Sequence, residues 1–421
     1  MKQLLNVSNR RSTGIWAALI FLVALNLRPA IAAVGPLLTR MGDDLGWGSG
    51  LQGALASVPL LAFAAVSPLV TIVVSGLGID VTILLALVAI AAGDIIRSFA
   101  GETGVWAGTV IFASAIAVGN VLVPVVAKRD YPNHVAMATG AYSACITCGS
   151  ALAGLTASAM AEAWGGWQYA LAFWAVPPLL VALLWGCRIV HSWRATAFGR
   201  TPEEPFAVPS ASDASNASGA SGEKHDIAHA GESMASLLRR PMTWWVTLFM
   251  GTQSSAFYTM SNWMPSVSEH AGFSATVAGV HLFVFQSIGI FSGLLIPKLM
   301  HVRGNQVCAA LTSSVPMVIA GIGMLLAPVA MPVWAFIGGA GQGASLVVAL
   351  ALIAMRGRSA SDTVRLSGLA QSVGYLIASM GPLLFGVLCQ LTGGYTVSLA
   401  VMTAIAVAQC AVAMLVGRSD E

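Results

Sequence analysis

Long apolar runs dominate this sequence. Runs without Asp, Glu, Lys or Arg exceed the ~20 residues that a membrane-spanning helix needs, and they cover 45–79, 103–127, 131–161, 163–187, 241–268, 304–355 and 366–417. The last two are each long enough for two spans. Because the runs are continuous, they do not fit the alternating strands of ~10 residues that build membrane β-barrels. The pattern therefore predicts an all-α membrane protein.

When these runs are divided at charged residues, glycines and prolines, the sequence predicts twelve spans. We expect them to begin near residues 14, 51, 79, 103, 134, 167, 241, 274, 306, 331, 363 and 395. Between the sixth and the seventh, residues 209–222 are rich in serine, alanine and glycine and too poor in apolar side chains to form a core. We therefore expect an N-terminal six-helix bundle over 1–189, a partly disordered linker over 190–240 and a C-terminal six-helix bundle over 241–421.

The two halves match each other weakly at an offset of 228 residues. Gly165-Gly-Trp167 aligns with Gly393-Gly-Tyr395, and Lys128 aligns with Arg356. Chance matching of small residues is the alternative explanation, but the matches fall at equivalent places in each half. Since six spans is an even number, both halves would share one orientation, as in the parallel repeats of one large transporter architecture.

Composition and charge exclude several classes of protein. Only 9% of the residues are charged, against ~25% in soluble domains, so a soluble enzyme is excluded. A net charge of +3 offers no basic face for nucleic acid. Apart from Arg28 within the membrane, the basic residues lie on the side of the N-terminus, with Arg40 and Arg97 as the exceptions. The excess of Lys and Arg predicts that both termini and the linker are cytoplasmic.

Arg28 is the residue that says most about function, because it lies about midway along the first span. An arginine there costs ~2.5–3.5 kcal/mol to insert and stays charged. One interpretation is that it binds an anionic cargo, since a guanidinium matches carboxylate-like oxygens. The other is a structural bond, either to helix carbonyls around Pro29 or to Asp94 in the third span. Arg97, three residues beyond Asp94, is a nearer partner for that acid.

Further polar residues are expected at similar depth when a rise of ~1.5 Å per residue is counted along each span. They could bind substrate, or they could bond between helices. The candidates near the midplane are Gln253, Gln286, Gln342, Gln371 and Tyr375, with Asn120 and Tyr142 nearer the inner face and Tyr258 and His281 higher. His281 and Asp94 are the candidates for proton coupling, although a lone helical histidine is often a hydrogen-bonded packing residue.

Enzyme motifs are missing from the sequence. Gly338-Gly-Ala-Gly-Gln-Gly343 lacks the G-K-[ST] ending and the preceding strand of a phosphate loop. No zinc motif, serine triad or paired carboxylate occurs either. We therefore expect no catalytic residue, no metal and no cofactor, and transport energy from gradients rather than from ATP.

Three stretches carry a family resemblance. They are Asn26-Leu-Arg-Pro29 with Val34-Gly-Pro-Leu37, Ala117-Val-Gly-Asn-Val-Leu-Val-Pro124 with Lys128-Arg-Asp-Tyr-Pro132, and Ser372-Val-Gly-Tyr375 with Gly381-Pro382. They resemble the cyanate permease and nitroimidazole transporter group of the major facilitator superfamily. The resemblance implies two six-helix bundles around a central cavity, alternating access, and small anionic or weakly acidic solutes as cargo in some members.

By the same resemblance, Arg28 is the expected anion ligand, and Asn26, Asn120, Tyr142 and Tyr375 are the group's other polar positions in the cavity. The sequence departs from the family in one loop. Ser75-Gly-Leu-Gly-Ile-Asp80 has the acid and the glycines of the superfamily's loop between spans two and three, but not its arginines. The gate of the first half is therefore expected to be held differently.

Together these features predict a monomeric secondary transporter of the bacterial inner membrane. Its partners would be the lipid bilayer, a small anionic or polar organic solute and, as the candidate coupling ion, the proton. A broad drug or nitroheterocycle exporter is the alternative that the methionine-rich composition and mostly uncharged lining also permit. A non-transporting sensor is a third possible function, but the linker over 190–240 would then lack an effector domain.

Overall fold

The computed structural model describes residues 16–132, 134–197, 234–300, 305–358 and 360–418, and within these ranges the regular structure is entirely helical. Eleven described helices are long and apolar enough to cross a membrane. A twelfth, α13 (Pro241–His270), has 30 residues but a more polar sequence. The all-α fold predicted above is confirmed. The serine-rich segment 209–222 lies outside the described residues, as do Lys2, Arg10, Arg11, Arg200, Lys224 and Arg303.

The N-terminal half begins with a helix over residues 16–25 and continues through a broken first span. Its further helices are α2 (Pro29–Ala32), η1 (Gly35–Leu37), α3 (Leu38–Leu45), α4 (Ser49–Val66), η2 (Ser67–Leu69), α5 (Val70–Leu77), α6 (Ile79–Phe99), α7 (Gly101–Asp130), α8 (Val135–Ala163), α9 (Trp167–Phe173) and α10 (Val176–Ala197). α10 extends beyond residue 189, and the domain boundaries given above remain predictions.

The C-terminal half follows the short helix α12 (Met234–Leu238). It consists of α13, α14 (Ala275–Leu299), α15 (Val307–Leu326), η4 (Pro328–Ala330), α16 (Met331–Arg356), α17 (Ala360–Thr392) and α18 (Thr396–Val416). Gly165 and Gly393, which the sequence repeat aligns, both have left-handed backbone conformations, with φ of 77° and 68°. Glycine adopts this conformation without the steric cost of a Cβ atom. Each glycine follows a long helix of its half, so the two halves share this turn.

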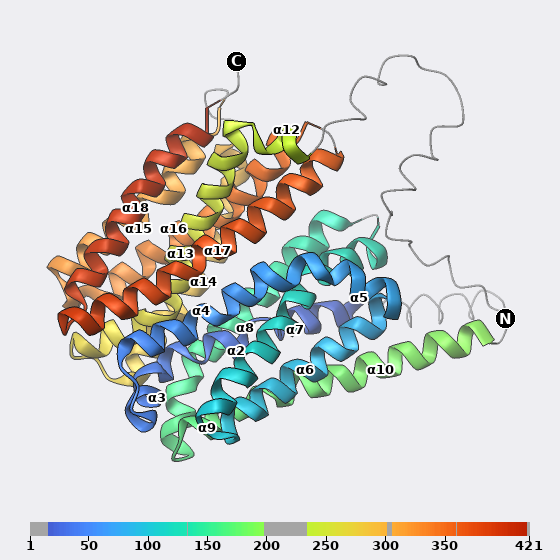
Figure 1. Cartoon of the computed structure of the whole chain (residues 1–421), viewed down its shortest axis with the longest axis horizontal. Coiled ribbons are helices and arrows are strands. Elements are labelled where there is room, and N and C mark those ends of the chain that lie inside the picture. Colours follow the sequence, from blue (N-terminus) through green and yellow to red (C-terminus); the bar gives the residue numbers. More distant parts are fainter. Residues whose placement is uncertain (1–15, 133, 198–233, 301–304, 359, 419–421) are drawn as a thin grey trace.

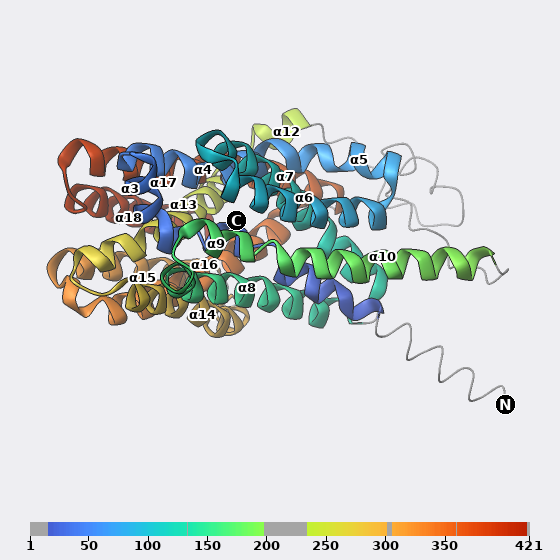
Figure 2. The same cartoon turned by 90° about the horizontal axis from the view of Figure 1, so that it is seen from below.

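The two halves lie side by side and meet through a few helices (Figure 1). α4 packs on α17 and α8 packs on α14, and in Figure 2 these two pairs lie toward opposite edges of the molecule. We call the end where α10 ends and α12 begins the linker end. Two of the hydrogen bonds that join the halves lie toward the opposite end, where the Gly50 N–H donates to Gln390 Oε1 at 2.9 Å and Thr39 meets Ser266 at 2.9 Å.

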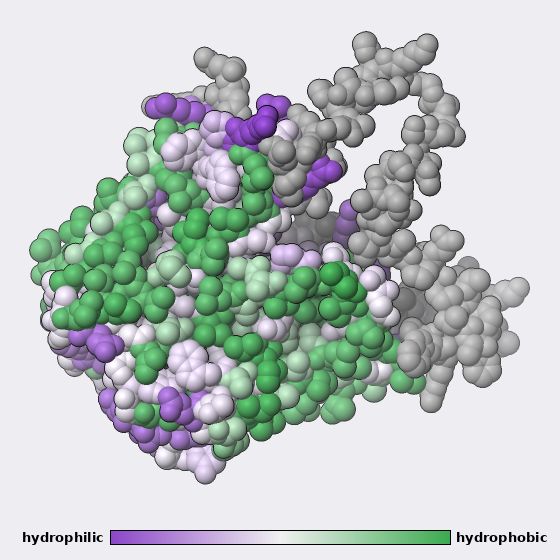
Figure 3. Space-filling model, in the orientation of Figure 1, coloured by the Kyte–Doolittle hydropathy of each residue, from purple (hydrophilic) through white to green (hydrophobic). Residues whose placement is uncertain are grey.

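The surface has the polarity of a membrane protein. On the face drawn in Figure 3, hydrophobic residues form a broad region between hydrophilic residues at the two ends. Large exposed apolar side chains of the described chain include Leu183, Leu294 and Phe291, each at least 65% exposed. Burying such side chains in lipid removes apolar area from water.

Candidate functional site

The first span is interrupted where Arg28 lies. Residues 26–28 are not helical, and Arg28 is the N-cap of the single turn α2. Pro29 explains the break, because it has no N–H to donate to the carbonyl of Leu25 and its ring would clash with that carbonyl in a continuous helix. Asn26 stabilises the end of the preceding helix by donating from Nδ2 to the Leu22 carbonyl at 2.8 Å.

Arg28 points to the boundary between the two halves. Its Nη1 donates to the hydroxyl of Tyr258 on α13, and its guanidinium carbon lies 5.2 Å from the centre of the Tyr258 ring and 6.0 Å from that of Phe63 on α4. Phe63 in turn meets the ring of Tyr375 on α17 edge to face, with centroids 5.5 Å apart. Four elements from both halves thus bring one cation and three aromatic rings together.

No carboxylate of the described chain compensates the charge of Arg28. Its one hydrogen-bond partner is the neutral Tyr258 phenol, and its Nε has none. Asp94 is bound by Arg97 instead, with Nη2 of Arg97 2.6 Å from Oδ1. The Arg28–Asp94 pair that the sequence left open is therefore not formed. Arg28 is half-buried as a residue, and its Nε is a buried donor.

The predicted glutamines fall into two groups. Gln253 donates to Ser254 at 2.7 Å, and Gln371 donates to Ser367 at 2.9 Å, each on its own helix. Gln286 on α14 and Gln342 on α16 are 3% and 2% exposed, and neither amide nitrogen nor oxygen has a partner in the described chain. A buried polar group without a partner costs ~1–3 kcal/mol, so these two amides differ from the other two in having hydrogen-bonding groups that are not used.

The remaining predicted polar residues are Tyr142, Tyr375 and Asn120. Tyr142 and Tyr375 are partly buried and pack against the same hydrophobic cluster as Tyr258. Asn120 is partly exposed on α7.

Neither candidate for proton coupling is among the side chains that contact Arg28 in the described chain. Asp94 is fully buried with Arg97 in α6. His281 is 3% exposed, its Nδ1 lies 2.7 Å from Ser268 Oγ, and its ring packs edge to face on Phe273.

The base missing from the loop before Asp80 is supplied by other helices. Arg129 at the end of α7 holds Asp80 at 2.8 Å and Asp130 at 2.8 Å, while Arg188 on α10 holds Asp130 at 2.7 Å. This cluster joins α6, α7 and α10 within the N-terminal half. The departure from the family loop is thus compensated by arginines that lie far from it in the sequence.

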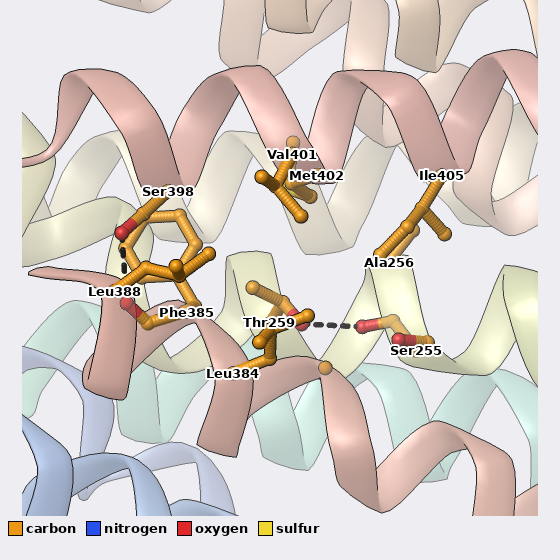
Figure 4. A pocket seen from close by; sticks show the side chains of 11 residues that line it. Ser255, Ala256, Thr259, Leu384, Phe385, Leu388, Ser398, Val401, Met402 and Ile405 are labelled. Atoms are coloured by element: carbon orange, nitrogen blue, oxygen red, sulfur yellow. Dashed lines mark hydrogen bonds between the residues drawn. The ribbon is translucent and has the colours of Figure 1, made fainter.

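Two hollows lie outside the Arg28 region. The first, between α13, α17 and α18, holds only about 10 Å³, room for no more than about one water molecule. Figure 4 shows its serine and threonine hydroxyls bonded to backbone carbonyls, Thr259 to Ser255 and Ser398 to Phe385. The second holds about 250 Å³ at the end opposite the linker end and is lined by Arg40, Asp43, Glu162 and Glu269 among others.

Comparison with known proteins agrees with this arrangement. The family model of the Major Facilitator Superfamily matches residues 17–337. The chain belongs to this superfamily. It is 31% identical over 402 residues to the 2-nitroimidazole transporter of Escherichia coli (strain K12), covering 96% of this chain and 95% of that protein. It is 20% identical over 378 residues to the cyanate transport protein of the same organism, covering 89% and 90%.

A solved structure shares the fold. The crystal structure of a D-xylose-proton symporter superposes with a TM-score of 0.72 at 14% identity and covers 96% of this chain and 97% of that one. This major facilitator superfamily protein is therefore a transporter rather than an enzyme, with many membrane-spanning helices in the bacterial inner membrane.

The sequence did not predict one residue of this site, Phe63, whose ring lies beside Arg28. A single apolar residue gives no signal of a site within an apolar span. Arg97 was expected on the outer side and as the nearer partner of Asp94, and it lies in the last turn of α6 with 0% exposure, bound to Asp94. The spacing of three residues predicts this pair, since residues three apart face the same side of a helix.

Proposed function

We propose that this transporter carries a small anionic or weakly acidic organic solute, and that Arg28 is the residue that binds its negative charge. The observation that carries the proposal is an arginine in a break of the first span whose guanidinium has a buried free donor and no carboxylate partner in the described chain. A cation held in the membrane without a counter-ion is costly. An anionic solute supplies the missing charge together with acceptors for the free guanidinium donors.

The position of Arg28 also fits alternating access. Arg28 and Phe63 belong to the N-terminal half, while Tyr258 and Tyr375 belong to the C-terminal half. A solute bound to Arg28 would therefore contact both halves and be released when they move apart. Asn26, Asn120, Tyr142, Gln253, Gln286, Gln342 and Gln371 complete the proposed set of polar positions.

The orientation follows from charge. The excess of basic residues puts the linker end in the cytoplasm, and the halves, 1–189 and 241–421, would flank a cytoplasmic linker over 190–240. The hydrogen bonds of Gly50 with Gln390 and of Thr39 with Ser266 then close the periplasmic side. The structure would thus represent a state open toward the cytoplasm.

A second candidate is a nitroheterocycle exporter. It is favoured by the 31% identity to a 2-nitroimidazole transporter. The rings of Phe63, Tyr258 and Tyr375 could stack on a heteroaromatic solute, and a nitro group offers two oxygens to Arg28. Arg28 would bind oxygen atoms of the solute in either candidate function, but only the anion transporter requires a charged solute.

The test is uptake by purified protein in liposomes of ¹⁴C-labelled cyanate, benzoate and 2-nitroimidazole. Arg28→Gln keeps a long polar side chain and removes the charge, so anion uptake should fall to the level of empty liposomes. The matched control is Arg239→Gln, which removes a charge from an exposed position at the linker end. Anion uptake that survives Arg28→Gln would overturn the assignment.

Proton coupling through Asp94 or His281 remains a prediction of the same proposal. Uptake driven by an imposed pH gradient, compared with and without a protonophore, tests it in the same liposomes. A gradient-independent rate would remove the proton from the proposed mechanism.

A further inference from the structure

The broken first span leaves the carbonyl of Ala30 without its helical donor. In a continuous helix this carbonyl would accept the N–H of Val34. Here the Val34 N–H donates to Ile31 at 3.2 Å instead, because the chain turns again after α2. Ala30 lies two residues beyond Arg28 and is buried. A buried carbonyl needs another donor.

Arg97 supplies that donor from α6. Its Nη1 lies 2.7 Å from the Ala30 carbonyl oxygen, and its Nη2 lies 2.6 Å from Oδ1 of Asp94. One planar guanidinium thus binds a backbone carbonyl with one nitrogen and its counter-ion with another. Within the described chain, no other side chain donates to the backbone of residues 26–34.

Arg97 is itself held in a close-fitting site between α6 and α7. Its guanidinium carbon lies 4.6 Å from the centre of the Phe112 ring. α7 approaches closely because residue 108 is glycine: a Cβ atom there would lie 2.8 Å from Arg97 Cα. The side chain is 0% exposed. It therefore has little freedom to move, and the carbonyl that it binds is fixed to α6.

The same turn fixes Arg28. As the N-cap of α2, Arg28 accepts the N–H groups of Ile31 at 3.1 Å and Ala32 at 3.0 Å. α2 has only four residues, so it has no length over which to absorb a displacement. A shift of Ala30 would move the backbone of Arg28 with it.

We propose that Arg97 is a positioning residue for Arg28, acting through the Ala30 carbonyl, and that Asp94 is the counter-ion that keeps Arg97 in place. This inference rests on the proposed function, because it gives Arg97 its importance through the anion ligand. Neither Arg97 nor Asp94 touches Arg28 or needs to touch the solute.

The test replaces the pair with apolar residues, as Asp94→Leu with Arg97→Met. Replacing both members of a buried ion pair with apolar side chains is often tolerated by the fold, whereas removing one leaves an uncompensated charge. The matched control is Gln409→Leu, which removes buried interhelical bonds to Ser314 and Ser345 in the other half. Both proteins are compared with wild type at full length in detergent.

The first readout needs no ligand. Hydrogen–deuterium exchange of peptides that cover residues 26–37 should become at least about 10-fold faster in the double variant, because the turn loses its anchor. Exchange in α13 should stay unchanged, and Gln409→Leu should leave residues 26–37 as in wild type. Unchanged exchange in 26–37 would overturn the inference.

The second readout is the thermal shift produced by sodium benzoate. The double variant should lose most of this shift although its ligand-free melting temperature is close to that of wild type. The positioning role would be overturned if the double variant kept the full thermal shift with benzoate while residues 26–37 exchanged faster. Loss of the anchor would then have no effect on anion binding. If wild type shows no shift with benzoate or cyanate, the proposed function fails, while faster exchange in 26–37 would still support Arg97 as the anchor of the turn.

Discussion

The guanidinium of Arg28 donates a hydrogen bond to the hydroxyl of Tyr258, 230 residues further along the chain. The contact joins the first span of one half to the first span of the other. A phenol orients a guanidinium but does not neutralise it. Arg28 therefore keeps a full positive charge at the boundary between the halves, and the following predictions test what this charge and its neighbours do.

Arg28→Lys should weaken anion binding without abolishing it. Lysine keeps the charge but loses the planar fork that can bind two oxygens at once, so we expect about a 10-fold rise in Kd. Isothermal titration of the purified variant with benzoate measures this. Affinity equal to that of wild type would show that the fork is not used.

Tyr258→Phe should keep the ring contact and remove the hydroxyl that orients Arg28. A hydrogen bond contributes ~0.5–1.5 kcal/mol, so anion affinity should fall by about 2- to 12-fold. The ligand-free melting temperature should change little, because the phenyl ring still fills the site. Tighter anion binding by the variant would mean that Tyr258 competes with the solute for Arg28.

Gln286→Leu should raise the stability of the ligand-free protein and weaken solute binding. Both amide atoms of Gln286 are buried without a partner, so leucine removes a desolvation cost of ~1–3 kcal/mol. Gln409→Leu is the contrasting variant, because Gln409 Nε2 donates to Ser314 at 3.1 Å, and it should lower the melting temperature. If both substitutions changed the melting temperature in the same direction and by the same amount, the interpretation that the Gln286 amide has no partner would be contradicted.

Gly53→Val should separate α4 from α17 at the end opposite the linker end. A Cβ atom at residue 53 would lie 2.5 Å from the Pro382 carbonyl oxygen and 3.2 Å from Gly386 Cα. Spin labels at Thr103 and Leu391, both exposed at this end, should move apart in a background without the native cysteines. Gly186→Val is the control, since a Cβ atom there meets no atom within 4 Å. An unchanged label distance in Gly53→Val would contradict this role of the α4–α17 contact.

The sequence was sufficient for the spans but not for the break within the first. Apolar run length and charged boundaries placed α14 and α17 within about three residues of the observed starts, because lipid imposes a minimum helix length. Free helix carbonyls around Pro29 were expected from the sequence, but not the separate turn α2. The donor to the Ala30 carbonyl in this turn is Arg97, 67 residues further along the chain, and a contact over that separation leaves no local signal.

The candidate site was predicted in part. Depth counting placed Arg28 with Tyr375, and the structure brings both into the aromatic group with Tyr258 and Phe63. Depth counting could not distinguish Gln286, whose amide has no hydrogen-bond partner, from Gln253, whose amide bonds within its own helix. Such distinctions depend on helix rotation and on rotamers, which periodicity does not determine when a helix is surrounded by protein on most sides.

The most direct test of the central claim is a thermal-shift comparison of wild type and Arg28→Gln in detergent. The ligands are cyanate and benzoate as anions, 2-nitroimidazole as a heterocycle and tetraphenylphosphonium as a lipophilic cation. We predict that an anion raises the melting temperature of wild type and leaves that of Arg28→Gln unchanged. Stabilisation by tetraphenylphosphonium or 2-nitroimidazole to the same extent in both proteins, with no response to either anion, would contradict the account and make Arg28 a structural residue.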